Sequence, residues 1–415
     1  MPAAPDHGPR GWGSSTLRRT TLTLGAAQLV SWGVLVYAFA VVSPRIVAET
    51  GWSEPVVAGA FSVGLLVSGL AAPAITGMLA RHGPRAVLSI GSVGGAVGLL
   101  AFAAAHHLVV LYGAWVLIGL AMAATLYEPA MAVVVALDPS RRQRSVATIT
   151  LAGGLASTVF APLTSVLVGA LGWRFAIVAL AVAGCGTTLA LHATVRPAGT
   201  ATATSFAAAV PGVIDSHLVR RLRVALLVEQ VAATGTTTHL VGLVVARGAT
   251  LAIASTALGA MGLGKVAGRL LLLSPVGRRP SAQLAAWCAV IQGVGLAVPL
   301  LTVRVPFLLV AVVVAAAGSG AMTVLRPLLV VEGVGVDDFA AVSASIQRSA
   351  APARALAPFA LGAGVVVLGW TTTWLLFLVA FGIAADRYRR LAAVALLTPP
   401  RREGRNVRPA GTAAV

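Results

Sequence analysis

The chain has few charged residues for its length. Only 10% of its 415 residues are Asp, Glu, Lys or Arg, whereas soluble globular proteins have about 25%. This composition argues against a water-soluble enzyme. Cysteine is also scarce. Cys185 and Cys288 are the only two, and both lie inside apolar stretches, so the sequence predicts neither a disulfide framework nor a metal cluster.

What the chain has in abundance is apolar sequence, at 58% of all residues. A helix that crosses a membrane needs about 20 apolar residues. We therefore predict an all-α integral membrane protein with twelve transmembrane helices in two bundles of six. The apolar stretches are at 21–43, 55–79, 86–105, 108–136, 146–170 and 174–194, and then at 222–246, 250–273, 281–302, 306–331, 340–368 and 371–391.

The same pattern predicts the domain organisation. An N-terminal tail at 1–20 precedes the first bundle at 21–194, a linker at 195–221 joins it to the second bundle at 222–391, and a tail follows at 392–415. Most of the 30 Lys and Arg residues fall in the tails, the linker and alternate short loops, and only Arg45, Arg174, Arg247 and Arg304 fall in the other loops. This bias predicts that both tails and the linker are cytoplasmic in the cell membrane.

The net charge of +18 could indicate nucleic-acid binding, but the basic residues form no continuous stripe.

The chain also contains an internal repeat. Gly119, Pro129, Pro162 and Gly172-Trp173 recur in the same order as Gly320, Pro327, Pro358 and Gly369-Trp370. Two related halves in parallel are typical of one class of membrane transporter.

The segment from Pro73 to Arg85 resembles the cytoplasmic signature loop of the major facilitator superfamily, Gly-x-Leu-x-Asp-Arg-x-Gly-x-Arg. The candidate residues of this loop are Gly77, Arg81, Gly83 and Arg85, whereas Thr76 and Ala80 stand where Gly and Asp are usual. The resemblance implies the twelve-helix fold of that superfamily and transport by alternating access. In that superfamily the Asp helps to hold the two halves together on the cytoplasmic side. The resemblance therefore also implies that this contact is altered here, where Ala80 replaces the Asp.

Two further segments resemble the monocarboxylate and oxalate/formate branch of this superfamily: Arg141–Gly154 and Gly259–Arg269. An ionisable residue inside a spanning helix is costly and usually faces a cavity or a partner. Arg354 lies about 21 Å from the cytoplasmic end of its helix, too deep to reach water. It binds a substrate anion or pairs with a fixed acid. A basic residue on the equivalent helix of oxalate/formate carriers supports the first alternative.

Other buried charges are also candidates. Lys265 and Arg269 are one helical turn apart and are predicted to bind substrate, although Arg269 also lies near enough to the helix end to reach the surface. Glu229 is the first candidate for proton coupling, or a partner of Lys265. His239 is a candidate for substrate binding, with ordinary packing as the alternative.

Glu128 and Arg326 occupy equivalent positions in the repeat, each just before a proline. We predict that they form a gate pair across the two bundles, with packing inside each bundle as the alternative. Glu128 is also the second candidate for proton coupling.

The sequence thus predicts a monomeric secondary transporter for a small organic anion, a mono- or dicarboxylate, by proton coupling or exchange. An efflux pump for a drug-like compound or secondary metabolite is the first alternative, and a membrane sensor or scaffold is the second. We expect the lipid bilayer and a small molecule as partners, and no nucleic acid, cofactor or enzymatic activity.

Overall fold

The computed structural model describes residues 14–127, 129–131, 133, 142–195, 216–272, 274–334 and 339–397. All regular secondary structure in these ranges is helical, as the composition predicts. The linker residues 196–215 and most of both predicted tails lie outside the described residues.

In the described part of the first half, nine helical elements have bounds at both ends, two of them π-helical turns. They are α1 (Ser14–Trp32), η1 (Gly33–Tyr37), α2 (Ala38–Thr50), α3 (Glu54–Ala103), α4 (Leu108–Thr125), α6 (Arg142–Gly154), α7 (Ala156–Ala179), η2 (Leu180–Cys185) and α8 (Gly186–Ala193). The second half holds α10 (His217–Ala246), α11 (Leu251–Leu271), the short η3 (Pro275–Arg278), α12 (Ser281–Leu301), α13 (Val305–Val334) and α14 (Phe339–Leu397).

Three of these helices turn back on themselves at a single glycine. Gly83 in α3, Gly172 in α7 and Gly369 in α14 have φ of 77°, 76° and 78°, with ψ of 164° to 166°. Residues other than glycine essentially never adopt this backbone conformation. Each glycine therefore ends one membrane-length helix and starts the next without a loop.

Nine candidate membrane spans lie within the described residues. Two of them are 46 residues long and contain the turns at Gly172 and Gly369, so each is long enough for two crossings. Helix α10 is a further 30-residue helix of the second half. This arrangement is compatible with the predicted twelve crossings.

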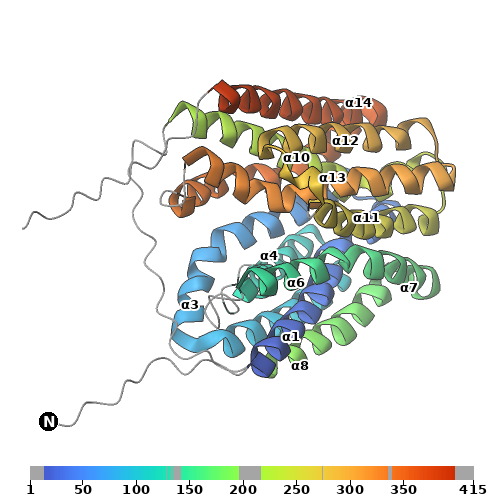
Figure 1. The fold of residues 1–415 in the computed structure, drawn as a ribbon. Helices are drawn as coiled ribbons and strands as arrows, with labels where there is room; N and C mark the ends of the chain where they lie inside the picture. The colour runs from blue at the N-terminus through green and yellow to red at the C-terminus, as the bar shows by residue number, and fades with distance from the viewer. Residues whose placement is uncertain are drawn as a thin grey trace, which may run out of the picture.

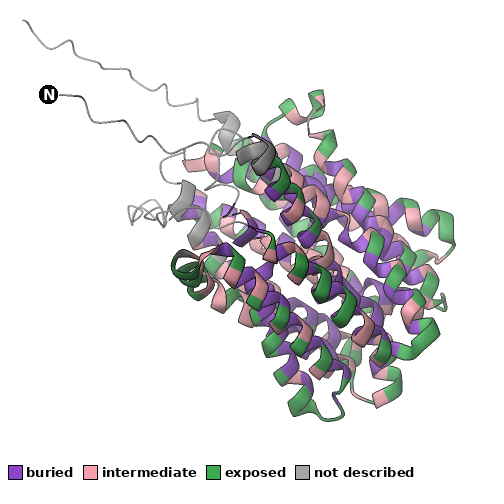
Figure 2. Cartoon of the chain, turned by 90° about the horizontal axis from the view of Figure 1, so that it is seen from below, coloured by how far each residue is buried: buried purple, intermediate pink, exposed green. Residues whose placement is uncertain are grey.

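The two halves lie side by side, the first below the second in Figure 1. Buried residues line the inside of each half, and exposed residues are frequent on the outer faces (Figure 2). Many of the exposed side chains are large and apolar, with Val109, Leu301 and Val367 each more than three-quarters exposed. An apolar outer surface of this kind suits lipid rather than water.

We call the end of the molecule formed by residues 51–53, 104–107, 247–250 and 302–304 the loop end, and the opposite end, where α1 and α10 begin, the tail end. The halves are packed together toward the loop end. There, a Cβ on Gly362 of α14 would lie 3.3 Å from the Glu54 carbonyl oxygen of α3. Toward the tail end of α3, Leu70 is 73% exposed.

Candidate substrate-binding site

Lys265 reaches from the second half of the molecule to the first. Its ammonium donates a hydrogen bond of 2.8 Å to the Tyr37 hydroxyl and lies 5.0 Å from the centre of the Tyr37 ring. Tyr37 is the last residue of η1, and π-helical turns are frequent at functional sites because they displace side chains from the regular helical register. Lys265 is half-buried and Tyr37 is buried.

Two more aromatic residues of the first half continue from Tyr37. Its ring lies 6.3 Å from that of Trp32, which in turn lies 5.0 Å from Tyr127. The sequence reasoning missed these three residues, because an aromatic side chain in an apolar helix is ordinary. The one sequence feature that could have pointed to them is that they place hydroxyl and indole N–H groups in otherwise apolar stretches.

Arg269 closes this arrangement into a ring of contacts. Its guanidinium donates to the Thr150 carbonyl in the first half, which also accepts a 3.5 Å hydrogen bond from the Tyr127 hydroxyl. Arg269 also donates to the Thr323 hydroxyl at 3.1 Å. It therefore bridges the halves through neutral groups. We call Trp32, Tyr37, Tyr127, Lys265 and Arg269 the cation–aromatic site.

Glycines determine how closely helix α11 can bring these two cations to the other half. A Cβ on Gly262 would collide with Thr158 of α7, and one on Gly259 would lie 3.1 Å from Pro162. Gly264 and Gly268 instead pack against α13. The glycine-rich pattern around Lys265 thus serves two close helix contacts, one to each side.

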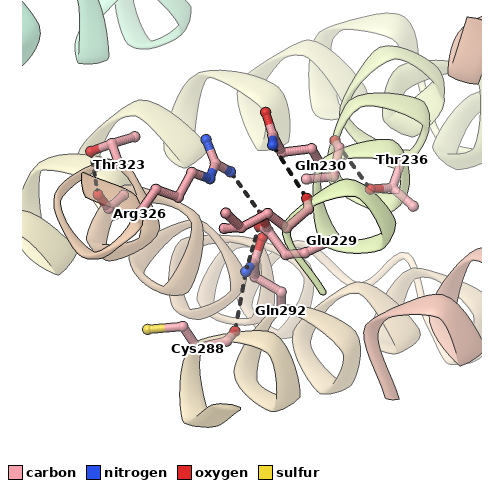
Figure 3. Close-up of polar contacts among 10 residues, drawn as sticks. Glu229, Gln230, Thr236, Cys288, Gln292, Thr323 and Arg326 are labelled. Carbon is pink, nitrogen blue, oxygen red and sulfur yellow. Dashed lines mark hydrogen bonds and ion pairs between the residues drawn. The ribbon is translucent and has the colours of Figure 1, made fainter. Parts of the chain in front are cut away.

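The predicted pairing of Glu229 with Lys265 is wrong. Glu229, which is fully buried, accepts a 2.9 Å ion-pair hydrogen bond from Arg326 and a 3.3 Å hydrogen bond from Gln292 (Figure 3). These residues come from α10, α13 and α12. Lys265 lies on α11, which follows α10 directly along the chain, but α13 rather than α11 presents the cation to Glu229.

The same contact bears on the predicted gate. Arg326 is bonded to an acid of its own half, as in the alternative of packing inside each bundle. Glu128 lies outside the described residues, so its predicted roles as gate and proton carrier stay predictions, as does the proton role of Glu229.

His239 has a partner on each ring nitrogen. Nδ1 lies 3.0 Å from the Glu54 carboxylate of α3, and Nε2 lies 2.9 Å from the Pro358 carbonyl of α14. His239 is only 3% exposed. Arg354 is half-buried in the part of α14 between Ala351 and Phe359, both of which lie close to α3. Its predicted role in substrate binding stays a prediction.

The signature-loop residues lie at the tail-end turn of α3. Arg81 and Arg85 are exposed on either side of Gly83, and Gly77 is exposed one turn before Arg81. The surroundings of the Ala80 side chain lie outside the described residues. The positive φ of Gly83 explains why this position of the motif requires glycine.

A family model described as Major Facilitator Superfamily matches residues 24–358. The chain belongs to the Major Facilitator Superfamily. The superfamily resemblance of the signature loop is thereby confirmed, whereas the monocarboxylate and oxalate/formate branch stays a prediction. A comparison with curated proteins finds no match to this chain.

Solved structures of other transporters share this Major Facilitator Superfamily fold. A mutant of the nucleoside transporter NupG superimposes with a TM-score of 0.71 at 13% identity, covering 90% of this chain and 99% of its own. A bacterial homologue of the human lysosomal transporter Spinster, inward-facing and occupied, gives 0.68 at 15% identity, covering 95% and 100%. At such identities the likeness shows the fold alone. The chain is therefore a multi-pass membrane protein with the fold of a secondary transporter.

Proposed function

We propose that this chain transports a small organic anion, a mono- or dicarboxylate, which binds at the cation–aromatic site. The observation that carries the proposal is the pair of cations on α11. Within the described part of the chain, no ion pair joins Lys265 or Arg269 to a carboxylate, and both donate to neutral oxygens.

Such cations favour an anion for an electrostatic reason. A charge within a membrane protein is costly unless an opposite charge or several hydrogen bonds compensate it. A tyrosine hydroxyl and a carbonyl compensate a cation only in part. A carboxylate that displaced them would form charge-assisted hydrogen bonds, which are about twice as strong as neutral ones.

The rest of the site fits the apolar part of such a substrate. Trp32, Tyr37 and Tyr127 offer ring faces and edges beside the cations. Resemblance of Gly259–Arg269 to the monocarboxylate and oxalate/formate branch supports the same substrate class. Localisation in the cell membrane with both termini cytoplasmic, a monomeric state, and coupling to protons or by exchange complete the proposal.

A second candidate is an uncharged ring compound. The aromatic cluster favours it, since planar rings stack on such side chains, and NupG, whose fold this chain shares, is a nucleoside transporter. In that case Lys265 and Arg269 would serve to hold the halves together.

Counterflow in proteoliposomes distinguishes the two. Wild type is tested with labelled small carboxylates and a labelled nucleoside, beside Lys265→Gln. Arg247→Gln is the matched control, because Arg247 is a cation at the loop end, and its one hydrogen bond within the described residues goes to the Thr371 hydroxyl. We expect saturable uptake of one acid, reduced at least about ten-fold by K265Q, the size of one lost charge-assisted bond, and nearly unchanged by R247Q.

Uptake of the nucleoside but of no carboxylate would refute the anion proposal. So would transport of an acid by K265Q at the wild-type rate.

A further inference from the structure

The contact between Glu54, His239 and the Pro358 carbonyl joins the two halves at the loop end. Glu54 is the first residue of α3, in the first half, whereas His239 on α10 and Pro358 on α14 belong to the second. The side chains of His239 and Glu54 are 2% and 13% exposed. The substrate proposal uses neither residue.

The hydrogen-bond partners fix how many protons this contact contains. A carbonyl oxygen only accepts, so Nε2 of His239 carries a hydrogen and donates it to Pro358. In a neutral imidazole the other nitrogen, Nδ1, is then an acceptor. Nδ1 lies 3.0 Å from Oε1 of Glu54, and an ionised carboxylate is also only an acceptor.

Two acceptors cannot share a hydrogen bond without a hydrogen between them. The contact therefore requires one proton more than a neutral histidine and an ionised glutamate possess. That proton lies either on Nδ1, giving an imidazolium paired with a carboxylate, or on Oε1, giving a carboxylic acid that donates to Nδ1. Both arrangements complete the same three-part contact.

The described surroundings offer no other acid at this contact. The Trp370 ring lies 6.2 Å from the imidazole, and Glu229, on the same helix, is about 15 Å away and paired with Arg326. Other charged residues lie at a similar depth on α10 or on the helices packed against it. They are Arg247 at the end of α10, Arg354 on α14 one turn before Pro358, and Arg45 and Glu49 on α2. Of these, Arg247 bonds the Thr371 hydroxyl and Glu49 pairs with Arg174.

We propose that Glu54 and His239 form a proton-binding site that closes the loop end of the transporter. With the proton bound, the two halves are held together. Without it, the neutral imidazole has a single N–H and can donate to Glu54 or to Pro358 but not to both, so one of the two contacts between the halves faces a nitrogen lone pair. The loop end then opens, and water solvates the groups left without a partner. Because linkage is reciprocal, opening the loop end releases the proton.

The site supplies a way to couple proton movement to the change of conformation. It does so at a position distinct from Glu229 and Glu128, and it is independent of which substrate the cation–aromatic site binds. Failure of the anion proposal would leave it untouched.

Distance measurements between spin labels on the two halves test it in the full chain. Val109→Cys in α4 and Leu301→Cys in α12 place labels on exposed residues at the loop end of each half, with the buried Cys185 and Cys288 replaced by alanine. In lipid nanodiscs, we expect the shorter distance to dominate at about pH 5. As the pH is raised, the ratio of the population with a longer distance to that with the shorter distance should increase by up to about ten-fold per pH unit. That is the slope for the release of one proton.

Glu54→Gln removes the titration but keeps the geometry, because its amide donates to Nδ1 without an added proton. We expect this variant to stay closed from about pH 5 to about pH 9. Glu49→Gln is the matched control: Glu49 lies at the same end but pairs with Arg174 of its own half, 3.7 Å away. It should keep the wild-type response.

His239→Gln carries the same prediction if E54Q does not fold, since a glutamine amide donates to Glu54 without titrating. A wild type whose distances do not change with pH would overturn the proposal. An E54Q or H239Q variant that keeps the wild-type pH response would also overturn it.

Discussion

Arg326 illustrates how a single buried charge is compensated inside one half of the molecule. Its guanidinium lies 2.9 Å from a Glu229 oxygen that water does not reach, and Gln292 donates to the other oxygen. Removing one member of such a pair leaves an uncompensated buried charge, whereas replacing both by neutral groups is much less harmful. Each member of the pair, on α10 and α13, is therefore needed chiefly because the other is present.

This gives a prediction at the residue scale. Arg326→Ala should lower the free energy of unfolding by about 3–5 kcal/mol, because it strands the Glu229 carboxylate. Adding Glu229→Gln should restore most of that loss. Thermal unfolding in detergent of wild type, both single variants and the double variant forms a double-mutant cycle. Additive losses would show that the two side chains act separately.

At this scale the sequence draws attention to a conspicuous charge but not to the ordinary residue that it contacts. Lys265, Arg269 and His239 stand out because they interrupt apolar helices. Tyr37 and Glu54 do not, since an aromatic residue inside a span and an acid at its end are both common. Pairing depends on which helix packs against which, and spacing along the chain does not contain that information.

At the scale of one element, the single-glycine turns depend on a backbone conformation that other residues avoid. Gly172 in α7 has a φ of 76° and open space around its missing side chain. Gly172→Ala should therefore destabilise the protein by about 1–3 kcal/mol through backbone strain alone. Gly169→Ala, three residues earlier in the same helix and equally open, should be neutral or stabilising. Equal melting temperatures for the two variants would contradict the prediction.

Helix α11 allows a comparison between two glycines with different partners. Gly262 faces Thr158 of the other half, and Gly268 faces Ala317 of its own half. Gly262→Ala should slow transport at least about ten-fold with little change in melting temperature, because it obstructs the approach of the halves. Gly268→Ala should instead lower the melting temperature, as overpacking of a tight contact costs about 1–3 kcal/mol. Both are measured by counterflow and thermal unfolding.

If G262A lowered the melting temperature as much as G268A, the two contacts would have the same role. Interference with closure would then not explain the loss of transport.

Helix positions followed from hydropathy, but helix breaks did not. The apolar stretch at 108–136 predicts one helix, yet α4 ends at Thr125 and Leu126 is extended, with ψ of −159°. Pro129 has no N–H to bond the Thr125 carbonyl four residues earlier. That carbonyl instead accepts a 2.6 Å hydrogen bond from Gln28 of α1. The proline was visible in the sequence, but the replacement donor was not.

At the scale of the whole molecule, the distribution of basic residues predicts which end faces the cytoplasm. Arg304→Cys at the loop end should react with a membrane-impermeant maleimide in intact cells. Val276→Cys in η3, at the tail end and 46% exposed, should react only after permeabilisation. Cys185 and Cys288 are buried and serve as the unreactive background. The opposite pattern of labelling would reverse the predicted orientation.

Composition and patterning were sufficient for the membrane class and the two halves, because both depend on properties summed over many residues. The superfamily followed instead from the resemblance of one short segment, Pro73 to Arg85, to its signature loop. The cation–aromatic site could be predicted only in its charged members. It is assembled from α1, η1 and α11, together with Tyr127 just beyond the end of α4, while α6 and α13 supply the oxygens that Arg269 contacts. Lys265 and Tyr37 meet only because glycines on α11 allow the halves to approach.

The single-residue turns at Gly83, Gly172 and Gly369 have a mechanical consequence. Each turn joins two helices without any loop residues between them. Neither helix can therefore slide or tilt far without moving the other. Movement is accommodated more readily where a helix itself departs from regular geometry, as at Leu126 and in the π-helical turns η1 and η2. We expect the conformational change of transport to bend the molecule at such irregular points, and Tyr37, which contacts Lys265, belongs to one of them.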